Sequence, residues 1–275
     1  MLKSKNLSVH LKDDLCYIGF PKFEKTSLVK VAFTTRMGGV SKGQFASMNV
    51  STTNGDNLDD VKKNYEILGN AVGFDFKKTV LSRQTHTDNI RIVKEDDIGK
   101  GLIKDRDYND VDGLITNISG VTLVTQFADC TPLLFLDPEN KVIANVHSGW
   151  RGTVQQIGKR AVEIMQKEFG SKPENIIAAI GPCINKCCYE VDDPVYNEFA
   201  KREVFSLEKV FTKKENGKFM LDLVEANKEI LLSAGIREEN LDISDLCTHC
   251  SSHIFHSHHA TAGKRGTLGA FITLI

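Results

Sequence analysis

Three short apolar segments in the middle of the chain constrain its fold most. They cover residues 121–124, 133–136 and 142–146, and the turn Asp137-Pro138-Glu139-Asn140 joins the last two. Apolar runs of this length between turn residues are typical of buried strands. The chain therefore places adjoining strands, covered by other elements, at its centre.

Further strands and helices are predicted on both sides of these segments. Residues 29–35, 80–81, 90–93 and 176–180 have the composition of strands, and the polar stretch 94–110 is expected to form a loop over one rim of a site. Helices are predicted after Asn57, over 153–169 up to Gly170, from Asp193-Pro194, and over 223–234. This order predicts an α/β fold, in which residues 1–275 form a single layered domain with a mixed β-sheet flanked by helices.

The charge pattern argues against polyanionic partners. The formal net charge is -1, and acidic and basic residues are interspersed without a broad basic face, so neither a nucleic acid nor a membrane is an expected partner. The N-terminal residues lack the apolar core of a signal peptide, and the seven cysteines are an odd number. We expect a cytoplasmic protein with reduced thiols. Its oligomeric state is not readable from the sequence.

Two histidines and a cysteine lie at predicted strand ends. His147 ends an apolar strand and precedes Ser-Gly-Trp-Arg-Gly, Cys130 lies in Asp129-Cys130-Thr131-Pro132, and His86 follows another apolar segment. One thiolate with two imidazoles suits zinc and also copper, and three protein ligands leave a coordination position open for chemistry. Asp129 is placed to orient a ligand, carry a proton or cap the turn.

Two other groups of metal-binding residue types occur near the C-terminal half. The string Cys183-Ile184-Asn185-Lys186-Cys187-Cys188, which has CxxxC spacing, and the CxxC pair Cys247 and Cys250 could together supply a four-thiolate zinc site, but the spacings favour plain reduced thiols in a pocket wall. A histidine cluster follows, and three of its members would share a face if the segment were helical; the cluster comprises His249, His253, His256, His258 and His259. This cluster is the main sequence argument for copper.

Basic residues near glycines are candidates for phosphate binding. Arg36 precedes Gly38-Gly39, and Arg151 lies at the start of the helix that follows His147. A tight turn with a solvated arginine is the alternative for Arg36, and a capping or surface arginine is the alternative for Arg151. Asn49 is a further candidate pocket residue.

Five strings together resemble the YfiH/YlmD-like laccase-domain family. They are Thr34-Thr35-Arg36-Met37-Gly38-Gly39-Val40-Ser41, Gln84-Thr85-His86, Ala128-Asp129-Cys130-Thr131-Pro132, His147-Ser148-Gly149-Trp150-Arg151-Gly152 and Gly181-Pro182-Cys183-Ile184. Members of that family were first labelled polyphenol oxidases and are now assigned as purine nucleoside phosphorylases that also deaminate adenosine. The resemblance implies a YfiH-like fold with a cysteine-hydrolase-like core.

The same resemblance implies a zinc-dependent enzyme, with His86, Cys130 and His147 as ligands and purine nucleosides and phosphate as substrates. The implied reactions are phosphorolysis of adenosine, inosine and methylthioadenosine, and deamination of adenosine. The chain departs from the family at Gly266-Thr267, where a Gly-Arg pair is usual, so Arg265 or Lys264 is expected to replace the missing basic group. The alternatives are a copper-dependent polyphenol oxidase, a cysteine hydrolase using Cys130 and His147, and a metal-binding protein without turnover.

Overall fold

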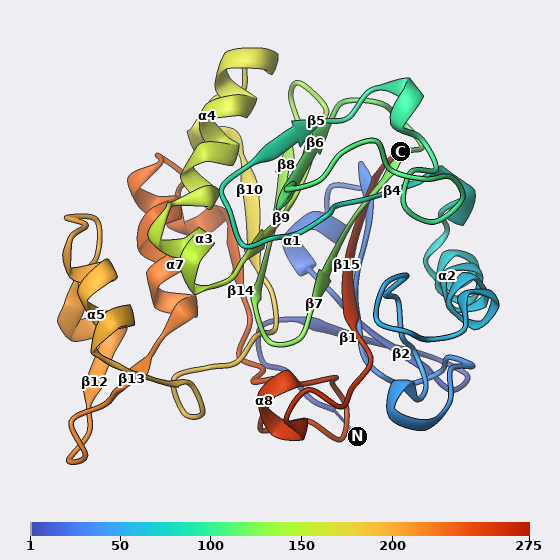
Figure 1. The fold of residues 1–275 in the computed structure, drawn as a ribbon. Helices are drawn as coiled ribbons and strands as arrows, with labels where there is room; N and C mark the ends of the chain where they lie inside the picture. The colour runs from blue at the N-terminus through green and yellow to red at the C-terminus, as the bar shows by residue number, and fades with distance from the viewer. Residues whose placement is uncertain (1) are drawn as a thin grey trace.

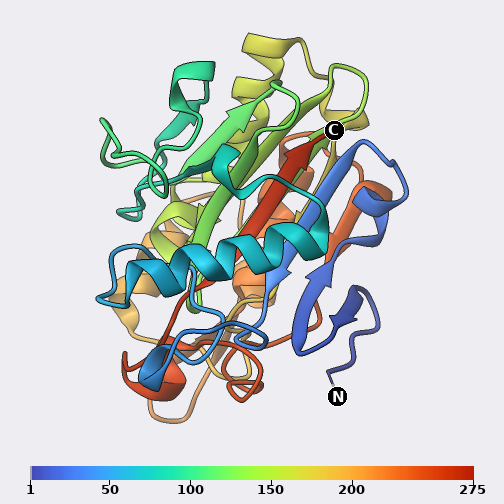
Figure 2. The ribbon, with the colours of Figure 1, turned by 90° about the vertical axis from the view of Figure 1, so that its right-hand side faces the viewer.

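The computed structural model describes residues 2–275, whose main strands form two stacked sheets with helices on both outer faces (Figures 1 and 2). The first sheet has the order β1 (Ser8–Lys12), β2 (Leu15–Gly19), β3 (Val29–Thr34), β15 (Leu268–Leu274), β7 (Thr122–Phe127) and β4 (Thr79–Leu81). The second has the order β14 (Leu241–Ile243), β10 (Ile177–Ile180), β8 (Thr131–Asp137), β9 (Val142–Ser148), β6 (Gly113–Thr116) and β5 (Ile90–Ile92).

Both sheets are mixed, as the sequence predicts. The pair β4–β7 is parallel in the first sheet, the pairs β5–β6 and β10–β14 are parallel in the second, and the other pairs are antiparallel. The helix α2 (Leu58–Val72) covers the first sheet, whereas α4 (Ile157–Phe169) and α7 (Leu223–Ser233) cover the second. The mixed α/β class is confirmed, but the sequence did not divide the strands between two sheets.

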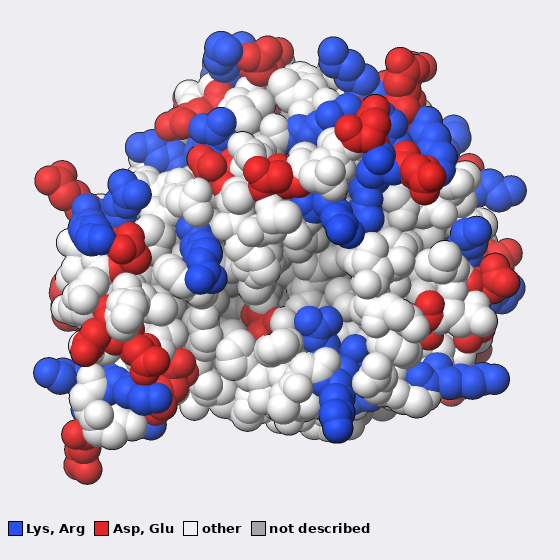
Figure 3. Space-filling view, in the orientation of Figure 1, with Lys and Arg blue, Asp and Glu red and all other residues white. Residues whose placement is uncertain are grey.

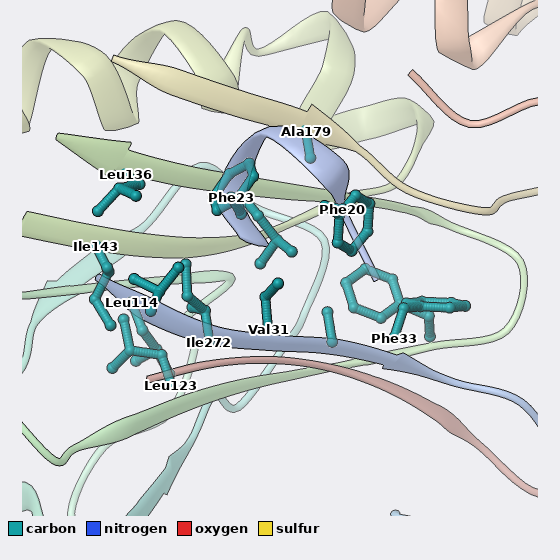
Figure 4. Packing of buried hydrophobic residues seen from close by; sticks show 14 of the residues in the cluster. Phe20, Phe23, Val31, Phe33, Leu114, Leu123, Leu136, Ile143, Ala179 and Ile272 are labelled. Atoms are coloured by element: carbon teal, nitrogen blue, oxygen red, sulfur yellow. The ribbon is translucent and has the colours of Figure 1, made fainter. Parts of the chain in front are cut away.

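Alternating side chains hold these four layers together. Along β8, Leu134 and Leu136 point into the space between the sheets, whereas Leu133 and Phe135 pack toward α4 and α7. The space between the sheets also holds Phe20 and Phe23, which the short helix α1 (Pro21–Glu24) brings there (Figure 4). Because β8 is buried on both faces, it is a continuous apolar run rather than an alternating one.

A third, smaller sheet projects beside α7. It consists of β11 (Glu190–Val191), β13 (Phe219–Leu221) and β12 (Phe211–Lys213), and it packs with α5 (Asp193–Ala200) and α6 (Leu207–Val210) through an aromatic cluster. The short helix α8 (His258–Thr261) precedes β15, the last strand of the chain. Among residues 2–275, no helix combines the length and apolar character needed to cross a membrane.

Several predicted boundaries need correction. The helix expected over 153–169 is two helices, α3 (Trp150–Val154) and α4, because Gln156 adopts a left-handed conformation between them. Asn57 caps α2 as predicted, and Gly170 ends α4 in the left-handed conformation. Residues 248–254 form turns rather than a helix, so the C-terminal histidines do not share a helical face.

A buried amide connects the two sheets. Asn145 on β9 is fully buried, and its Nδ2 donates to the carbonyl oxygens of Leu123 (2.9 Å) and Ala270 (2.8 Å) on the other sheet. Its Oδ1 accepts from the hydroxyl of Thr125. Both amide hydrogens and the oxygen of this side chain therefore have partners across the sheet interface, two residues before His147.

We expect Asn145→Leu to lower the free energy of unfolding by about 2–3 kcal/mol. The hydroxyl of Thr125 and the carbonyl oxygens of Leu123 and Ala270 would each lose a buried hydrogen bond that water cannot replace. Urea unfolding followed by circular dichroism measures this change. Asn117→Leu, at an exposed position, is the matched control and should change little. Equal effects of the two substitutions would contradict a role of Asn145 in connecting the sheets.

Candidate active site

Strand pairing brings Cys130 and His147 together. In the β8–β9 register, Pro132 pairs with His147, so Cys130 precedes β8 at the end where β9 finishes. His86 reaches the same point from the loop between β4 and β5, and its Nε2 lies 3.8 Å from the Cys130 Sγ. The three potential ligand atoms lie within 4.8 Å of one another. The structure thus brings together the three residues that the sequence placed at separate strand ends.

A buried carboxylate, Asp112, fixes both histidines. Its Oδ1 accepts from the Nδ1 of His147 (2.8 Å) and from the backbone N–H of His86 (3.0 Å). Its Oδ2 accepts from the backbone N–H groups of Thr85 (2.9 Å) and Thr87 (3.2 Å). Because Nδ1 of His147 is engaged by Asp112, Nε2 is the nitrogen left to face Cys130.

The backbone around the three residues is specialised. His86 has φ 66°, a left-handed conformation that is uncommon for a residue other than glycine, and the hydrogen bonds to Asp112 hold its turn in place. Gly149 follows β9 directly beside them. A Cβ at that position would lie 2.9 Å from Cδ2 of His86 and 3.1 Å from Sγ of Cys130, so a larger residue would push the side chains apart.

The electrostatics favour a charged thiolate. Burial raises the pKa of the Cys130 thiol, but His147 and His86 outweigh burial and lower that pKa to about 6. Burial lowers the pKa of His147, whereas the Cys130 charge and the hydrogen bond to Asp112 raise it to about 9. The two shifts are mutual, because each group stabilises the charged form of the other, so both favour a thiolate beside an imidazolium.

This donor set fits a single metal ion. One thiolate and two imidazoles are suitable ligands for zinc, and a set of three leaves a position open in tetrahedral coordination. The carboxylate behind His147 is the usual outer partner of a ligating histidine. Binding a cation would require His147 to lose its proton, and Asp112 would then accept a hydrogen bond from the neutral ring.

Two cavities meet at this centre, and His86, Cys130 and Arg265 line both of them. The first has a volume of about 300 Å³ and is lined by hydroxyl and amide side chains and by Arg83 and Arg106. None of the described residues lining it is an aspartate or glutamate. The second has a volume of about 430 Å³ and includes the rings of Trp150 and Tyr189. Figure 3 shows a hollow near the centre of this face, with Lys and Arg side chains on its rim.

Asp129 organises the wall of the second cavity. It is buried and accepts hydrogen bonds from the hydroxyl of Thr248 (2.6 Å) and from the backbone N–H and Nδ1 of His259 (both 2.9 Å). Burial raises the pKa of Asp129, but these hydrogen bonds lower it to about 2. The same hydrogen bond raises the pKa of His259, whose ring stands against Tyr189 at 5.4 Å. Asp129 therefore positions His259 rather than one of the three central residues.

The structure places Arg36 and Asn49 outside the lining of both cavities. The Arg36 guanidinium donates to the carbonyl oxygens of Ala46 (2.9 and 3.1 Å) and Ser252 (3.1 Å), and Arg36 lines neither cavity. Asn49 is fully buried and bonds to Asp56 and to the backbone of Ser51 and Thr267. The Asn49 amide is fully engaged in holding loops, and three of the five N–H groups of Arg36 bind loop carbonyls outside both cavities.

The other predicted basic residues differ in position. Arg151 lies at the rim of the second cavity, with its guanidinium 4.2 Å from the centre of the Trp150 ring. Arg265 lines both cavities, and its buried Nε has no hydrogen-bond partner within the described chain. Lys264 is exposed and lines neither. Of the two expected substitutes, Arg265 is thus the one positioned at the centre.

Sequence reasoning missed Asp112, Arg83, Arg106 and the pairing of Asp129 with His259. Asp112 immediately precedes the strand β6, so its position at a strand end was a usable signal, whereas the arginines belong to exposed loops without a pattern. Residues 94–110 form a loop as predicted, except for a short 3-10 helix over Glu95–Asp97. This loop contributes Arg106 to the lining of the first cavity.

The C-terminal cysteines and histidines that the sequence suggested as metal ligands lie in different places in the structure. Only two groups of three or more adjacent ligand side chains occur in residues 2–275: the central three residues, and the four cysteines Cys187, Cys188, Cys247 and Cys250. The C-terminal histidines belong to neither group. His256 is buried and accepts from the N–H of Gly266, whereas His258 and His259 line the second cavity.

Comparisons with known proteins agree on one family. Residues 30–275 match the family model described as "Multi-copper polyphenol oxidoreductase laccase". The chain is 37% identical to purine nucleoside phosphorylase YlmD of Bacillus subtilis (strain 168), over 89% of this chain and 88% of the relative. It is 32% identical to adenosine deaminase RL5 of an unknown prokaryotic organism, over 82% and 87% of the two chains.

A solved structure has the same fold. The crystal structure of the Bacillus licheniformis hypothetical protein YfiH superposes with a TM-score of 0.91 at 32% identity, covering 97% of this chain and 99% of that one. The similarity therefore includes both sheets and the segments that carry the central residues.

We expect Asp112→Asn to weaken zinc binding at the centre about 10- to 100-fold, because an amide is a poorer acceptor for His147 and no longer holds the ring in one orientation. Competition with a chromophoric chelator measures the affinity. Asp110→Asn is the matched control, because Asp110 contacts Thr87 and Asn89 on the same loop but not His147. Equal weakening in both variants would indicate that only the loop, not the carboxylate behind His147, matters.

Proposed function

The chain belongs to the multi-copper polyphenol oxidoreductase laccase family, and we propose that it is a zinc-dependent purine nucleoside enzyme. The proposed reactions are phosphorolysis of adenosine, inosine and methylthioadenosine, and deamination of adenosine. Relatives named purine nucleoside phosphorylase and adenosine deaminase support this substrate class.

One observation carries the proposal: a cationic cavity and an aromatic cavity both adjoin the same centre and share His86, Cys130 and Arg265 as lining residues. Arg83, Arg106 and Arg265 provide guanidinium groups on the first side, and planar guanidinium groups bind phosphate through paired hydrogen bonds. Trp150 and Tyr189 provide flat apolar surface for a purine on the second. A nucleoside spanning the two cavities has its glycosidic bond near His86 and Cys130.

In phosphorolysis, a phosphate oxygen forms a bond to the anomeric carbon while the bond from that carbon to the purine nitrogen breaks. The electron pair of the broken bond passes to the purine, which must gain a proton to leave as a neutral base. His259 is positioned for this transfer, because Asp129 keeps its ring protonated to higher pH and the ring lines the base cavity. The arginines hold the incoming phosphate and balance its charge.

His86, Cys130 and His147 are the residues that would hold the zinc ion. The ion would supply Lewis-acid chemistry at its open coordination position. The chain itself excludes bulk water from His147, which is 3% exposed, and Asp112 holds the His147 imidazole and the backbone of His86 in place. In deamination, water replaces the amino group of adenosine and ammonia leaves, so that reaction does not require the phosphate cavity.

The arrangement also favours one rival, a cysteine hydrolase. Cys130, His147 and Asp112 are ordered as nucleophile, base and orienting carboxylate, and the two histidines lower the pKa of the Cys130 thiol. A hydrolase of this type needs no metal, so zinc that is present in protein purified without added metal and is lost in Cys130→Ala supports the nucleoside enzyme. Rapid alkylation of Cys130 in metal-free protein, suppressed by zinc, would fit the proposed ligand role.

We expect the purified protein to convert adenosine and phosphate to adenine and ribose 1-phosphate, and adenosine to inosine, as separated by chromatography. Cys130→Ala should lose the central metal and nearly all of both activities, because it removes the anionic ligand. Cys16→Ala changes another buried thiol and should retain both. Oxidation of phenols without nucleoside turnover, accompanied by bound copper, would instead identify a polyphenol oxidase.

We expect Arg106→Lys to lower phosphorolysis about 30-fold, or about 2 kcal/mol in transition-state stabilisation, because lysine cannot form the paired contacts of a guanidinium. Adenosine deamination should change much less, and the apparent KM for phosphate should rise. Arg36→Lys is the control, since Arg36 lies outside both cavities. Equal loss of both reactions in Arg106→Lys would contradict a phosphate site in the first cavity.

A further inference from the structure

Four cysteines converge at a second position, separate from the central three residues. Cys187 and Cys188 lie between β10 and β11, and Cys247 and Cys250 lie between β14 and α8. Their sulfur atoms all lie within 4.8 Å of one another. The Cys250 Sγ is 3.5 Å from that of Cys187 and 3.3 Å from that of Cys188. The CxxC pair therefore meets the two adjacent cysteines Cys187 and Cys188. The CxxxC spacing had instead suggested Cys183 as the partner of Cys187 in this group.

The distances fit a metal ion better than a disulfide. Sulfurs bound to one tetrahedral zinc at 2.3 Å are about 3.8 Å apart, whereas bonded sulfurs are about 2.05 Å apart. Cys250 approaches Cys187 and Cys188 almost equally, and a disulfide would use only one of them. A shared ion uses all four thiols together.

The surroundings suit a charged tetrathiolate. The backbone N–H of Asn185 points to the Sγ of Cys247 at 3.4 Å, the kind of contact that stabilises a metal-bound thiolate. Cys247 is buried, Cys188 is intermediate, and Cys187 and Cys250 are exposed, so an ion can enter from solvent. Four sulfur ligands leave no open coordination position, which is typical of structural rather than catalytic zinc.

One cysteine-bearing segment lines the second cavity, and the other supports the wall of that cavity through a hydrogen bond. Tyr189 directly follows Cys188, and Thr248, which bonds to Asp129, directly follows Cys247. Direct backbone contact between the segments includes the N–H of Thr248 donating to the carbonyl of Cys183 at 2.9 Å. An ion that binds all four thiols would fix Tyr189 and the Asp129–His259 pair relative to each other.

We propose that Cys187, Cys188, Cys247 and Cys250 bind a second, structural zinc ion that fastens these two segments together. The proposal does not depend on what the central site catalyses. It predicts two zinc ions per chain, one held by the central three residues and one by the four thiolates.

Metal content measured by mass spectrometry on untagged protein purified under reducing conditions tests the proposal. We expect two zinc ions per chain in the unmodified protein and in Cys16→Ala. We expect one in Cys130→Ala, one in Cys187→Ser/Cys250→Ser, and none when these changes are combined. The Cys187→Ser/Cys250→Ser variant should keep the central ion while its KM for nucleoside rises several-fold, because the cavity wall loosens.

A spectroscopic measurement keeps the test decisive where the double variant folds poorly. Cobalt substituted into the folded Cys130→Ala protein should give the intense visible and near-ultraviolet bands of a tetrahedral site with four thiolates. Absence of these bands would overturn the proposal. So would two zinc ions retained in the Cys187→Ser/Cys250→Ser variant, or an intact mass two hydrogens lower that maps to a Cys188–Cys250 disulfide.

Discussion

The candidate active site depends on one buried carboxylate. Asp112 has no exposed surface, and it binds the ring of His147 and the backbone of the loop that carries His86. A buried charge is costly unless hydrogen bonds satisfy it, and here each oxygen has at least two partners. The hydrogen bonds that stabilise the buried charge of Asp112 also hold the His147 ring and the His86 backbone, which lie in different segments, in a fixed relative position.

The stacked sheets determine where this site can form. Apolar side chains fill the space between the sheets, and Asn145 joins β9 to β7 and β15 by hydrogen bonds. The chain can open cavities only where the strands end, because the interior is closely packed. Cys130 and His147 lie at such ends, and the irregular segments around them supply the arginines and aromatic rings.

The protein uses cysteine in two different environments. Cys130 is accompanied by two histidines beside the cavities, an arrangement that leaves room for a ligand to reach it. The four cysteines Cys187, Cys188, Cys247 and Cys250 face one another, and the segments that carry them also carry cavity-wall residues. An open ligand set is suited to chemistry, and a closed one is suited to holding loops in place.

The sequence by itself determined the mixed α/β class, the position of Cys130 just before one strand and of His147 near the end of the next, and the capped start of α2. These depend on local patterns: apolar runs, turn residues and capping side chains. Only the tertiary structure decided that Arg36 binds loop carbonyls while Arg106 and Arg265 line a cavity, since similar guanidinium groups differ only in which distant segments they meet. It also decided that Cys188, not Cys183, joins Cys247 and Cys250, because the direction of neighbouring side chains in an irregular loop follows from its packing and not from residue spacing.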